Sequence, residues 1–241
     1  MTFTPDFFVA LSAVFIAGVL RGFSGFGVGM VLVPILSLVY NPMVAVITVV
    51  LLEIIPSIQL VPGSIAQCDW RSVLPMAISG ILTVPLGSLI LVNTDADTMR
   101  IGIAVLVLLC VTILATGWRY QGGHSLRVPT MTGMASGLIS GAASLGGLPV
   151  ILYYLSGELN CKVARASIVV FLFITAMISL VTYLFHGIIH WDIVLRAVWL
   201  APVFIFAIWL GGRLFGKVSE SIFRSVTLTL LGGVGVMMLL S

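Results

Sequence analysis

The chain has 241 residues, of which 60% are hydrophobic and only 8% are charged, and its formal net charge is +3. Soluble domains average about 45–50% apolar and about 25% charged residues. The composition therefore excludes an ordinary soluble enzyme and indicates an integral membrane protein. The basic residues are scattered over short segments rather than gathered in a stripe, which argues against a nucleic-acid-binding surface.

Hydrophobic runs follow one another along the chain, and the longest match the ~20 residues that a helix needs to cross hydrocarbon. They are continuous, whereas the strands of a membrane barrel would alternate over about ten residues. We therefore expect an all-α integral membrane protein with roughly eight to ten membrane helices, some of them short, broken or re-entrant. The runs lie near 7–21, 28–40, 43–62, 72–92, 100–118, 128–143, 147–156, 163–186, 193–211 and 221–240.

The distribution of bases predicts an orientation. The first run has an acid, Asp6, and no base before Arg21, so it lacks the positive start of a cleavable signal and we expect a retained helix. If every run crosses, only Arg100 and Arg196 lie on the side of the N-terminus. The positive-inside rule then makes the other side cytoplasmic and places both termini outside. The bases on the cytoplasmic side are Arg21, Arg71, Arg119, Arg127, Lys162, Arg165, Arg213, Lys217 and Arg224.

An internal repeat is visible when the chain is shifted against itself by 119 residues. Each half, 1–122 and 123–241, contains five hydrophobic runs, an odd number, so the second half should enter the membrane upside down. Inverted repeats with short, glycine-interrupted segments at matching positions indicate a secondary transporter that holds its substrate near the midplane. The matched pairs are Gly22 and Gly141, Gly27 and Gly146, Asn41 and Asn160, Thr48 and Ser167, and, after a two-residue gap, Trp70 and Trp191.

Two glycine-rich segments, "RGFSGFGVG" (21–29) and "SGAASLGGLP" (140–149), each join a long run to a short one. Glycine lets a helix break at little cost. A break in hydrocarbon is tolerated only where protein or a water-filled cavity covers the freed backbone groups. We therefore expect these segments to line a cavity. Whether the short runs 28–40 and 147–156 cross or re-enter stays open.

The interruptions predict an oxyanion site. A helix that begins after a break points its first amides and the positive end of its dipole at the break. Arg21 adds a charged, multidentate donor, and serine hydroxyls add neutral ones. This chemistry needs no cofactor and no metal. The predicted substrate-binding residues are Arg21, Gly22, Ser24, Gly25, Gly27, Thr48, Ser140, Gly141, Ser144, Gly146, Gly147 and Ser167.

Plainer interpretations of the same residues stay open at this point. The spacing of Gly18, Gly22 and Gly25 also favours close helix packing without any binding site. Arg21 also fits a cytoplasmic anchor that obeys the positive-inside rule. The serine hydroxyls also fit bonds to the backbone at helix interfaces.

Glu53 lies in the middle of the run 43–62, three residues before Pro56. An ionisable group at that depth is costly and by default marks function, so Glu53 is the candidate carrier of a coupling proton. Its repeat partner is Leu172, which leaves open a neutral structural role and coupling to sodium instead. The cysteines Cys68, Cys110 and Cys161 show no metal-binding spacing.

At its glycine-rich segments the sequence resembles the sulfite exporter TauE/SafE family of membrane permeases, also called the toluenesulfonate uptake permease family. The family mark is roughly G-x-x-G-x-G-G-G-x-x-x-x-P in each half with a later K-x-A-x-x-[ST], which "KVARAS" (162–167) fits. Val28 and Ser144 stand where the family has glycine. The matching positions are Gly22, Gly25, Gly27, Gly29 and Pro34 in the first copy and Gly141, Gly146, Gly147 and Pro149 in the second.

The resemblance implies a carrier that moves a sulfur-containing oxyanion, such as sulfite, a sulfonate or sulfoacetate, across the bacterial inner membrane by alternating access. The outer side is then the periplasm, where both termini are expected. The expected partners are the small anion and the lipid bilayer. Direction, coupling ion and a homodimer are left open.

Two other functions fit parts of the sequence. "GFSG" (22–25) matches the nucleophile motif of rhomboid proteases, but catalysis needs a base near the serine, and His124, His186 and His190 all lie away from the middle of a run. We therefore expect no enzyme. An anion channel is the other alternative, although its rings of charge or carbonyls are not evident here.

Overall fold

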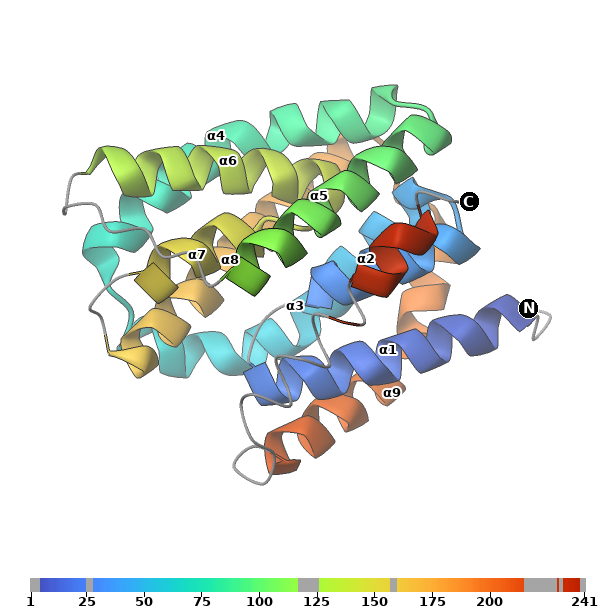
Figure 1. Ribbon diagram of the computed structural model, residues 1–241, viewed down its shortest axis with the longest axis horizontal. Helices are drawn as coiled ribbons and strands as arrows, with labels where there is room; N and C mark the ends of the chain where they lie inside the picture. Colours follow the sequence, from blue (N-terminus) through green and yellow to red (C-terminus); the bar gives the residue numbers. More distant parts are fainter. Residues whose placement is uncertain are drawn as a thin grey trace. The chain divides into compact units, whose positions relative to one another are not determined.

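The computed structural model of the protein describes residues 5–24, 28–116, 126–156, 160–214, 229 and 232–238. Within these residues the regular elements are all α-helices, as the sequence predicts (Figure 1). The helices are α1 (Pro5–Ser24), α2 (Val28–Val39), α3 (Pro42–Ile65), α4 (Trp70–Asn93), α5 (Ala96–Thr116), α6 (Arg127–Ala143), α7 (Gly147–Ser156), α8 (Cys161–Phe185) and α9 (Trp191–Leu214).

The helix boundaries follow the hydrophobic runs closely. The two runs predicted to be short form α2, of 12 residues, and α7, of 10 residues. Five helices are long and apolar enough to cross a membrane within the described ranges, namely α3, α4, α5, α8 and α9. Most of the last predicted run, 221–240, lies outside the described residues, although 229 and 232–238 are helical.

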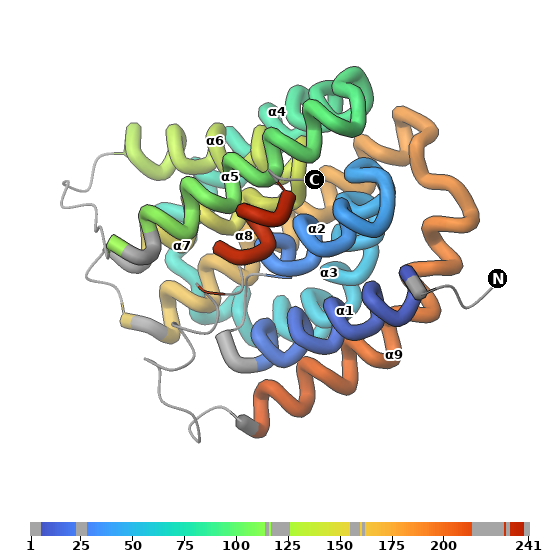
Figure 2. The backbone as a smooth tube through the Cα atoms, turned by 45° about the vertical axis from the view of Figure 1, so that its right-hand side comes forward, coloured from blue at the N-terminus to red at the C-terminus, as the bar shows by residue number. Residues whose placement is uncertain are grey.

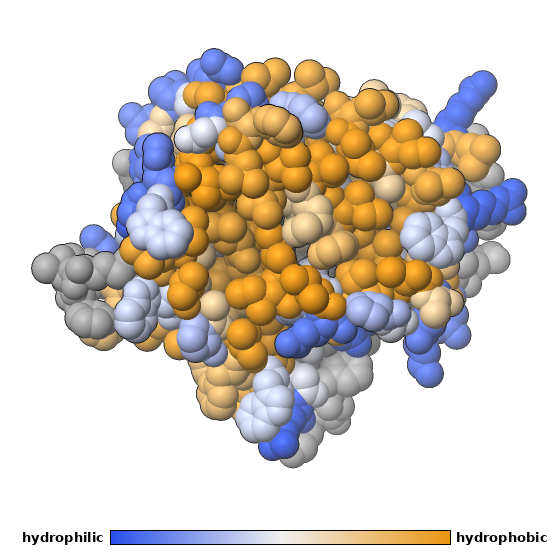
Figure 3. Space-filling model, turned by 180° about the vertical axis from the view of Figure 1, so that it is seen from behind, coloured by the Kyte–Doolittle hydropathy of each residue, from blue (hydrophilic) through white to orange (hydrophobic). Residues whose placement is uncertain are grey.

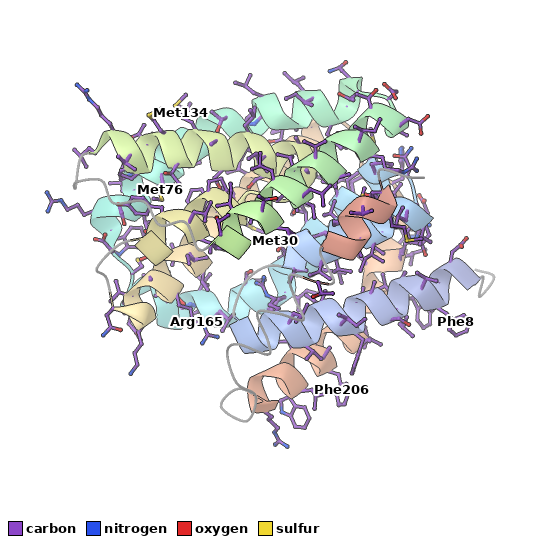
Figure 4. All side chains as sticks on the ribbon, viewed as in Figure 1. Phe8, Met30, Met76, Met134, Arg165 and Phe206 are labelled. Atoms are coloured by element: carbon purple, nitrogen blue, oxygen red, sulfur yellow. The ribbon has the colours of Figure 1, made fainter. Side chains whose placement is uncertain are left out.

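Large apolar side chains cover much of the outer surface. Phe8 on α1 and Phe206 on α9 are 57% and 55% exposed and project away from their helices (Figure 4). Figure 3 shows hydrophobic side chains over most of the face that it draws. Exposed apolar surface on this scale is unfavourable in water, so these side chains fit a lipid environment.

The helices form two compact units, which we describe separately. Unit 1 comprises Met1–Leu52, Thr94–Trp118 and Trp191–Ser241, and unit 2 comprises Glu53–Asn93 and Arg119–His190. The boundary falls inside α3, between Leu52 and Glu53. Each unit therefore takes helices from both halves of the sequence.

In unit 1, α1 lies along α9 (Figures 1 and 2). Their backbones touch through glycine. A Cβ added to Gly22 would overlap the Ile208 carbonyl oxygen and lie 2.8 Å from the Gly212 nitrogen. In the other direction, a Cβ on Gly211 would overlap the carbonyl oxygen of Val19. Such close approach is typical of small residues at membrane helix interfaces.

In unit 2, α6 lies along α4 in the same way (Figure 2). A Cβ added to Gly141 would overlap the Val84 carbonyl oxygen and lie 2.9 Å from the Ser88 nitrogen. A Cβ on Gly87 would overlap the carbonyl oxygen of Leu138. We call the α1–α9 and α4–α6 contacts the two glycine seams.

The glycine seams correspond residue by residue. Gly22 and Val19 of α1 lie 119 positions before Gly141 and Leu138 of α6, which is the shift that aligns the predicted repeats. On the facing helices the offset is 124 positions: Val84, Gly87 and Ser88 of α4 correspond to Ile208, Gly211 and Gly212 of α9. The first helix of each half thus packs on the fourth helix of the other half.

Arginine side chains hold the C-terminal end of α2 within unit 1. Arg100 Nε, from α5, donates to the carbonyl oxygen of Ser37 at 3.1 Å. The guanidinium of Arg196, from α9, lies 4.0 Å above the centre of the Tyr40 ring, just beyond the helix. Positive charge is favourable at a helix C-terminus. The two bases predicted on the outer side therefore fix one of the two short helices.

Candidate functional site

The second glycine-rich segment is a helix interruption. α6 ends at Ala143 and α7 begins at Gly147. Between them, Ser144 adopts a left-handed conformation with φ of 53°, and its amide donates to the carbonyl oxygen of Ser140 at 2.9 Å. This geometry is a standard helix end that most often uses glycine at the left-handed position. The interruption predicted at 140–149 is confirmed.

Hydroxyl groups satisfy the carbonyl oxygens at this interruption. Tyr183 Oη, from α8, donates to the carbonyl oxygen of Gly141 at 2.8 Å. Ser136 Oγ, from α6, donates to the carbonyl oxygen of Gly146. A Cβ on Gly146 would overlap the backbone carbonyl oxygen of Ser136 as well as Ser140 Oγ, so only glycine fits there. The acceptor side of the break is thus occupied by donors from neighbouring side chains.

The donor side of the break is the N-terminal end of α7. The first amides of a helix have no acceptor within that helix and carry the positive end of its dipole. Leu145 and Gly146 are buried and Gly147 is half-buried, so this end faces the interior of unit 2 rather than lipid. The arrangement can accept an anionic ligand, as the sequence predicts for such a break.

The first glycine-rich segment also separates two helices, α1 and α2. Arg21, in the last turn of α1, is only 4% exposed. Burial weighs against a solvated anchor for this arginine. The first residues of α2, Val28 and Gly29, are buried as well. The Ser24 side chain, Gly25 and Gly27 lie outside the described residues.

Packing explains part of what the sequence left open. Gly22 contacts α9 through its backbone, and a Cβ on Gly18 would lie 2.6 Å from the Ala207 Cβ. The alternative interpretation of these two glycines as packing residues is therefore confirmed. Gly141 has the same role in unit 2.

Thr48 and Ser167 are fully buried, in unit 1 and unit 2 respectively. Each hydroxyl donates to the carbonyl oxygen one turn earlier, Thr48 to Val44 at 2.7 Å and Ser167 to Val163 at 2.8 Å. Ser167 Oγ also accepts from the amide of Asp69 at 2.9 Å. The repeat partners thus share their local geometry and differ in their long-range contact.

Glu53 lies half-buried in α3, at the residue where unit 2 begins. The backbone carbonyl oxygen of Glu53 accepts a hydrogen bond from Ser57 Oγ at 2.6 Å. Ser57 directly follows Pro56 in the same helix. Arg165, on α8, is exposed. Among the described residues, no three His, Cys, Asp or Glu side chains gather as metal ligands.

Ser140, Gly141, Ser144, Gly146 and Gly147 lie in or beside the interruption between α6 and α7, whereas Ser167 lies on α8 and contacts the amide of Asp69. Sequence reasoning missed Tyr183 and Ser136, whose hydroxyls bond to carbonyl oxygens at the interruption. It also missed Asp69, which contacts Ser167, and the hydroxyls of Ser72 and Tyr154 bonded near it. A signal existed for Asp69, because an acid directly before a helical run is a typical N-cap.

Comparison with known proteins identifies the family of the chain. The family profile described as sulfite exporter TauE/SafE matches residues 10–238. The chain is 24% identical over 225 residues to the protein named "Probable sulfite/organosulfonate exporter TauE" from Cupriavidus necator. The aligned region covers 90% of this chain and 87% of the relative. No solved structure matches the chain.

The match spans both glycine seams and both glycine-rich segments, from the first turns of α1 to residue 238. Members of the matched family are exporters in membranes, which fits the apolar helices described above. The chain belongs to the TauE/SafE sulfite exporter family and is therefore a multi-pass membrane transporter, not an enzyme.

Proposed function

We propose that the protein is a secondary carrier that moves a small sulfur oxyanion, of the sulfite or sulfonate type, across the bacterial inner membrane by alternating access. The observation that carries this proposal is the buried interruption between α6 and α7 in a chain of the TauE/SafE family. The Cupriavidus relative, named for sulfite and organosulfonate, supports this substrate class.

The chemistry of the two interruptions suits such an anion. In unit 2, the N-terminal amides of α7 supply donors within a buried region. In unit 1, Arg21 supplies a buried charge with several donors. In this proposal each glycine-rich segment is by itself a candidate source of donors for the transported anion. Thr48, Ser140 and Ser167 are the candidate hydroxyl contacts, and α2 and α7 act as half-helices.

Anion binding is tested by thermal unfolding of the purified protein with sulfite, organic sulfonates, carboxylates or phosphate. A selective ligand raises the unfolding temperature by mass action, so sulfite or a sulfonate should stabilise and acetate should not. Transport is tested by sulfite exchange in proteoliposomes, where a carrier gives flux that saturates with substrate. Flux that rises without saturation would indicate a channel instead, and absence of both effects would refute the proposal.

We also propose that residues 1–122 and 123–241 are inverted repeats within one transmembrane domain, with both termini in the periplasm. The matching glycine seams support the repeat. Cys68 and Ile189 are repeat positions, so an Ile189→Cys variant should react with an impermeant maleimide in intact cells, while Cys68 reacts only after permeabilisation. Cys110 and Cys161 are replaced beforehand. Labelling of both positions from one side would contradict the inversion.

The labelling conditions follow from the environment of Cys68. Burial raises the pKa of its thiol above the ordinary value. Because the thiolate is the reactive form, labelling at neutral pH should be slow and should accelerate as the pH is raised. The comparison is therefore made at mildly alkaline pH.

Glu53 is the proposed carrier of a coupling proton. Its position in the middle of α3, at the start of unit 2, is unusual for an ionisable group in a membrane helix. Glu53→Gln should lose sulfite uptake driven by a pH gradient and keep exchange of sulfite for sulfite. Uptake at the wild-type rate in this variant would exclude the role.

A further inference from the structure

The C-terminal part of α9 carries two aromatic rings and a base in a row. Phe206, Trp209 and Arg213 follow one another at spacings of three and four residues, which places them on one face of the helix. The rings of Phe206 and Trp209 are stacked with their centres 5.8 Å apart, and Arg213 Cζ lies 3.9 Å from the centre of the Trp209 ring. We call these three residues the α9 cluster.

The α9 cluster lies on an exposed face of its helix. Phe206 and Trp209 are 55% and 50% exposed, Arg213 is exposed, and Figure 4 shows Phe206 projecting outward. A different face of the same segment packs on α1 through Gly211. Because the chain is a multi-pass membrane protein, the exposed face of α9 meets lipid.

The two arginines of α9 differ in what their donors can reach. Arg196 lies 4.0 Å above the Tyr40 ring and is half-buried within its own unit, whereas Arg213 is exposed. Within the described residues, no hydrogen bond or ion pair involves the Arg213 side chain. Stacking on Trp209 occupies one face of the guanidinium and leaves the five N–H donors at its edge available to an external acceptor.

The two helices of the glycine seam in unit 1 carry like charges at matching ends. Each has an acid in its first turn, Asp6 in α1 and Asp192 in α9, and a base in its last turn, Arg21 and Arg213. The helices run in the same direction, because the glycine contacts between them advance together along both. The bases therefore mark one end of the pair, and a basic end at a membrane surface attracts anionic lipid head groups.

We propose that the α9 cluster binds an anionic phospholipid of the surrounding membrane. The lipid phosphate accepts hydrogen bonds from the edge of the Arg213 guanidinium, and an acyl chain lies along the rings of Trp209 and Phe206. Tryptophan is enriched at the level of the head groups, and arginine side chains extend toward them from apolar surroundings. This interaction goes beyond the transport of a sulfur oxyanion and does not depend on it.

The combination of groups distinguishes an anionic lipid from other ligands. Free phosphate can bond to Arg213 but gains nothing from the exposed rings. A phosphatidylcholine can cover the rings, but the charge of its phosphate is offset by choline. An anionic phospholipid such as phosphatidylglycerol uses the base and both rings at once.

The test is a lipid titration of the purified, delipidated full chain in a neutral detergent. Phosphatidylglycerol, phosphatidylcholine and inorganic phosphate are added separately. A ligand of the folded state raises the unfolding temperature, and the rise gives the concentration at half-saturation. The wild type should respond to phosphatidylglycerol at lower concentration than to phosphatidylcholine, and should not respond to phosphate at the same concentrations.

Two variants separate the charge from the ring. Arg213→Gln should raise the half-saturating concentration of phosphatidylglycerol by about fivefold, the contribution of one arginine near an anionic membrane surface. Its response to phosphatidylcholine should not change. Trp209→Leu keeps an apolar side chain but removes the ring under the guanidinium, so it should weaken the response to phosphatidylglycerol by a smaller factor.

The matched control is Arg71→Gln. Arg71 is an exposed arginine of α4, and within the described residues no aromatic ring lies under its guanidinium. This variant should respond to phosphatidylglycerol as the wild type does. A wild-type response in Arg213→Gln or Trp209→Leu, or an equal loss in Arg71→Gln, would overturn the proposal. Stabilisation of the wild type by inorganic phosphate as strong as that by phosphatidylglycerol would also overturn it.

Discussion

The glycine seams of the two units are alike in their backbone contacts, yet the interruptions next to them differ in chemistry. Gly22 meets a carbonyl oxygen and an amide of α9 just as Gly141 meets a carbonyl oxygen and an amide of α4. One residue before each glycine, unit 1 has a buried arginine, Arg21, and unit 2 has a buried serine, Ser140. The glycine contacts are therefore a repeated part of the structure, whereas the difference between Arg21 and Ser140 is not explained by the repeat.

The same separation holds farther along the repeats. Thr48 and Ser167 are repeat partners with the same bond to their own helix, but Ser167 also accepts from the amide of Asp69. The symmetric backbone contacts of the glycine seams are sufficiently explained by packing. The asymmetric features, Arg21, Glu53 and the Asp69 contact, are not explained by the repeat.

The largest expected loss of stability comes from replacing a glycine of the glycine seams by a larger residue. Gly22→Ala and Gly141→Ala each place a methyl group on a backbone carbonyl oxygen of the facing helix. Overpacking of this kind costs about 1–3 kcal/mol or more. Both variants should unfold at clearly lower temperature than the wild type in detergent, and by similar amounts if the seams are equivalent.

The control is Gly102→Ala on α5, where an added Cβ has nothing within 4 Å. In an unobstructed helix, alanine is more favourable than glycine by about 0.5–1 kcal/mol. The same substitution should therefore be neutral or stabilising at this position. A seam variant as stable as the control would show that the helices do not touch through these glycines.

A smaller effect is expected at the end of α6. Tyr183→Phe removes the hydroxyl that donates to the Gly141 carbonyl oxygen. A hydrogen bond of this kind contributes about 0.5–1.5 kcal/mol. The melting temperature should fall modestly, and anion-induced stabilisation should fall with it because the interruption loosens. If neither quantity changes, Tyr183 does not support the interruption.

The smallest effect should distinguish the repeat partners Thr48 and Ser167. Thr48→Val removes a hydroxyl that is bonded, among the described contacts, only to a carbonyl oxygen of its own helix, so the cost should be at the low end for a hydrogen bond, about 0.5 kcal/mol. Ser167→Ala also removes the acceptor of the Asp69 amide and should cost about 1 kcal/mol. Equal melting temperatures for the two variants would mean that the hydrogen bond from the Asp69 amide to Ser167 Oγ does not contribute to stability.

Most helices could be predicted because the length of each hydrophobic run in the sequence predicts the length of the helix that it forms. The short runs became α2 and α7, and the glycine-rich segment at 140–149 became a helix end at Ser144. Helix pairing could not be predicted in this way. Periodicity identifies a helix but not its neighbour, so the pairing of α1 with α9 and of α4 with α6 depended on the contacts of the glycine seams.

The residues around the candidate site were harder to predict for a related reason. Tyr183 lies 42 positions from the carbonyl that it caps, and Tyr154 lies 82 positions from Ser72. An aromatic residue inside an apolar run has the sequence signature of a packing residue, and its hydroxyl acquires a role only from a partner on another helix. Arg21 was identifiable because a charge in such a run is costly wherever it lies.

The central claim is that the interruptions supply the donors for a sulfur oxyanion, and calorimetric titration of purified protein with sulfite tests it most directly. The account predicts saturable binding that Arg21→Ala weakens strongly, by about tenfold or more for a lost charged hydrogen bond. Ser140→Ala, at the matching position of the other repeat, should weaken binding by a smaller factor. Binding of sulfite that both variants retain at wild-type affinity would contradict the account.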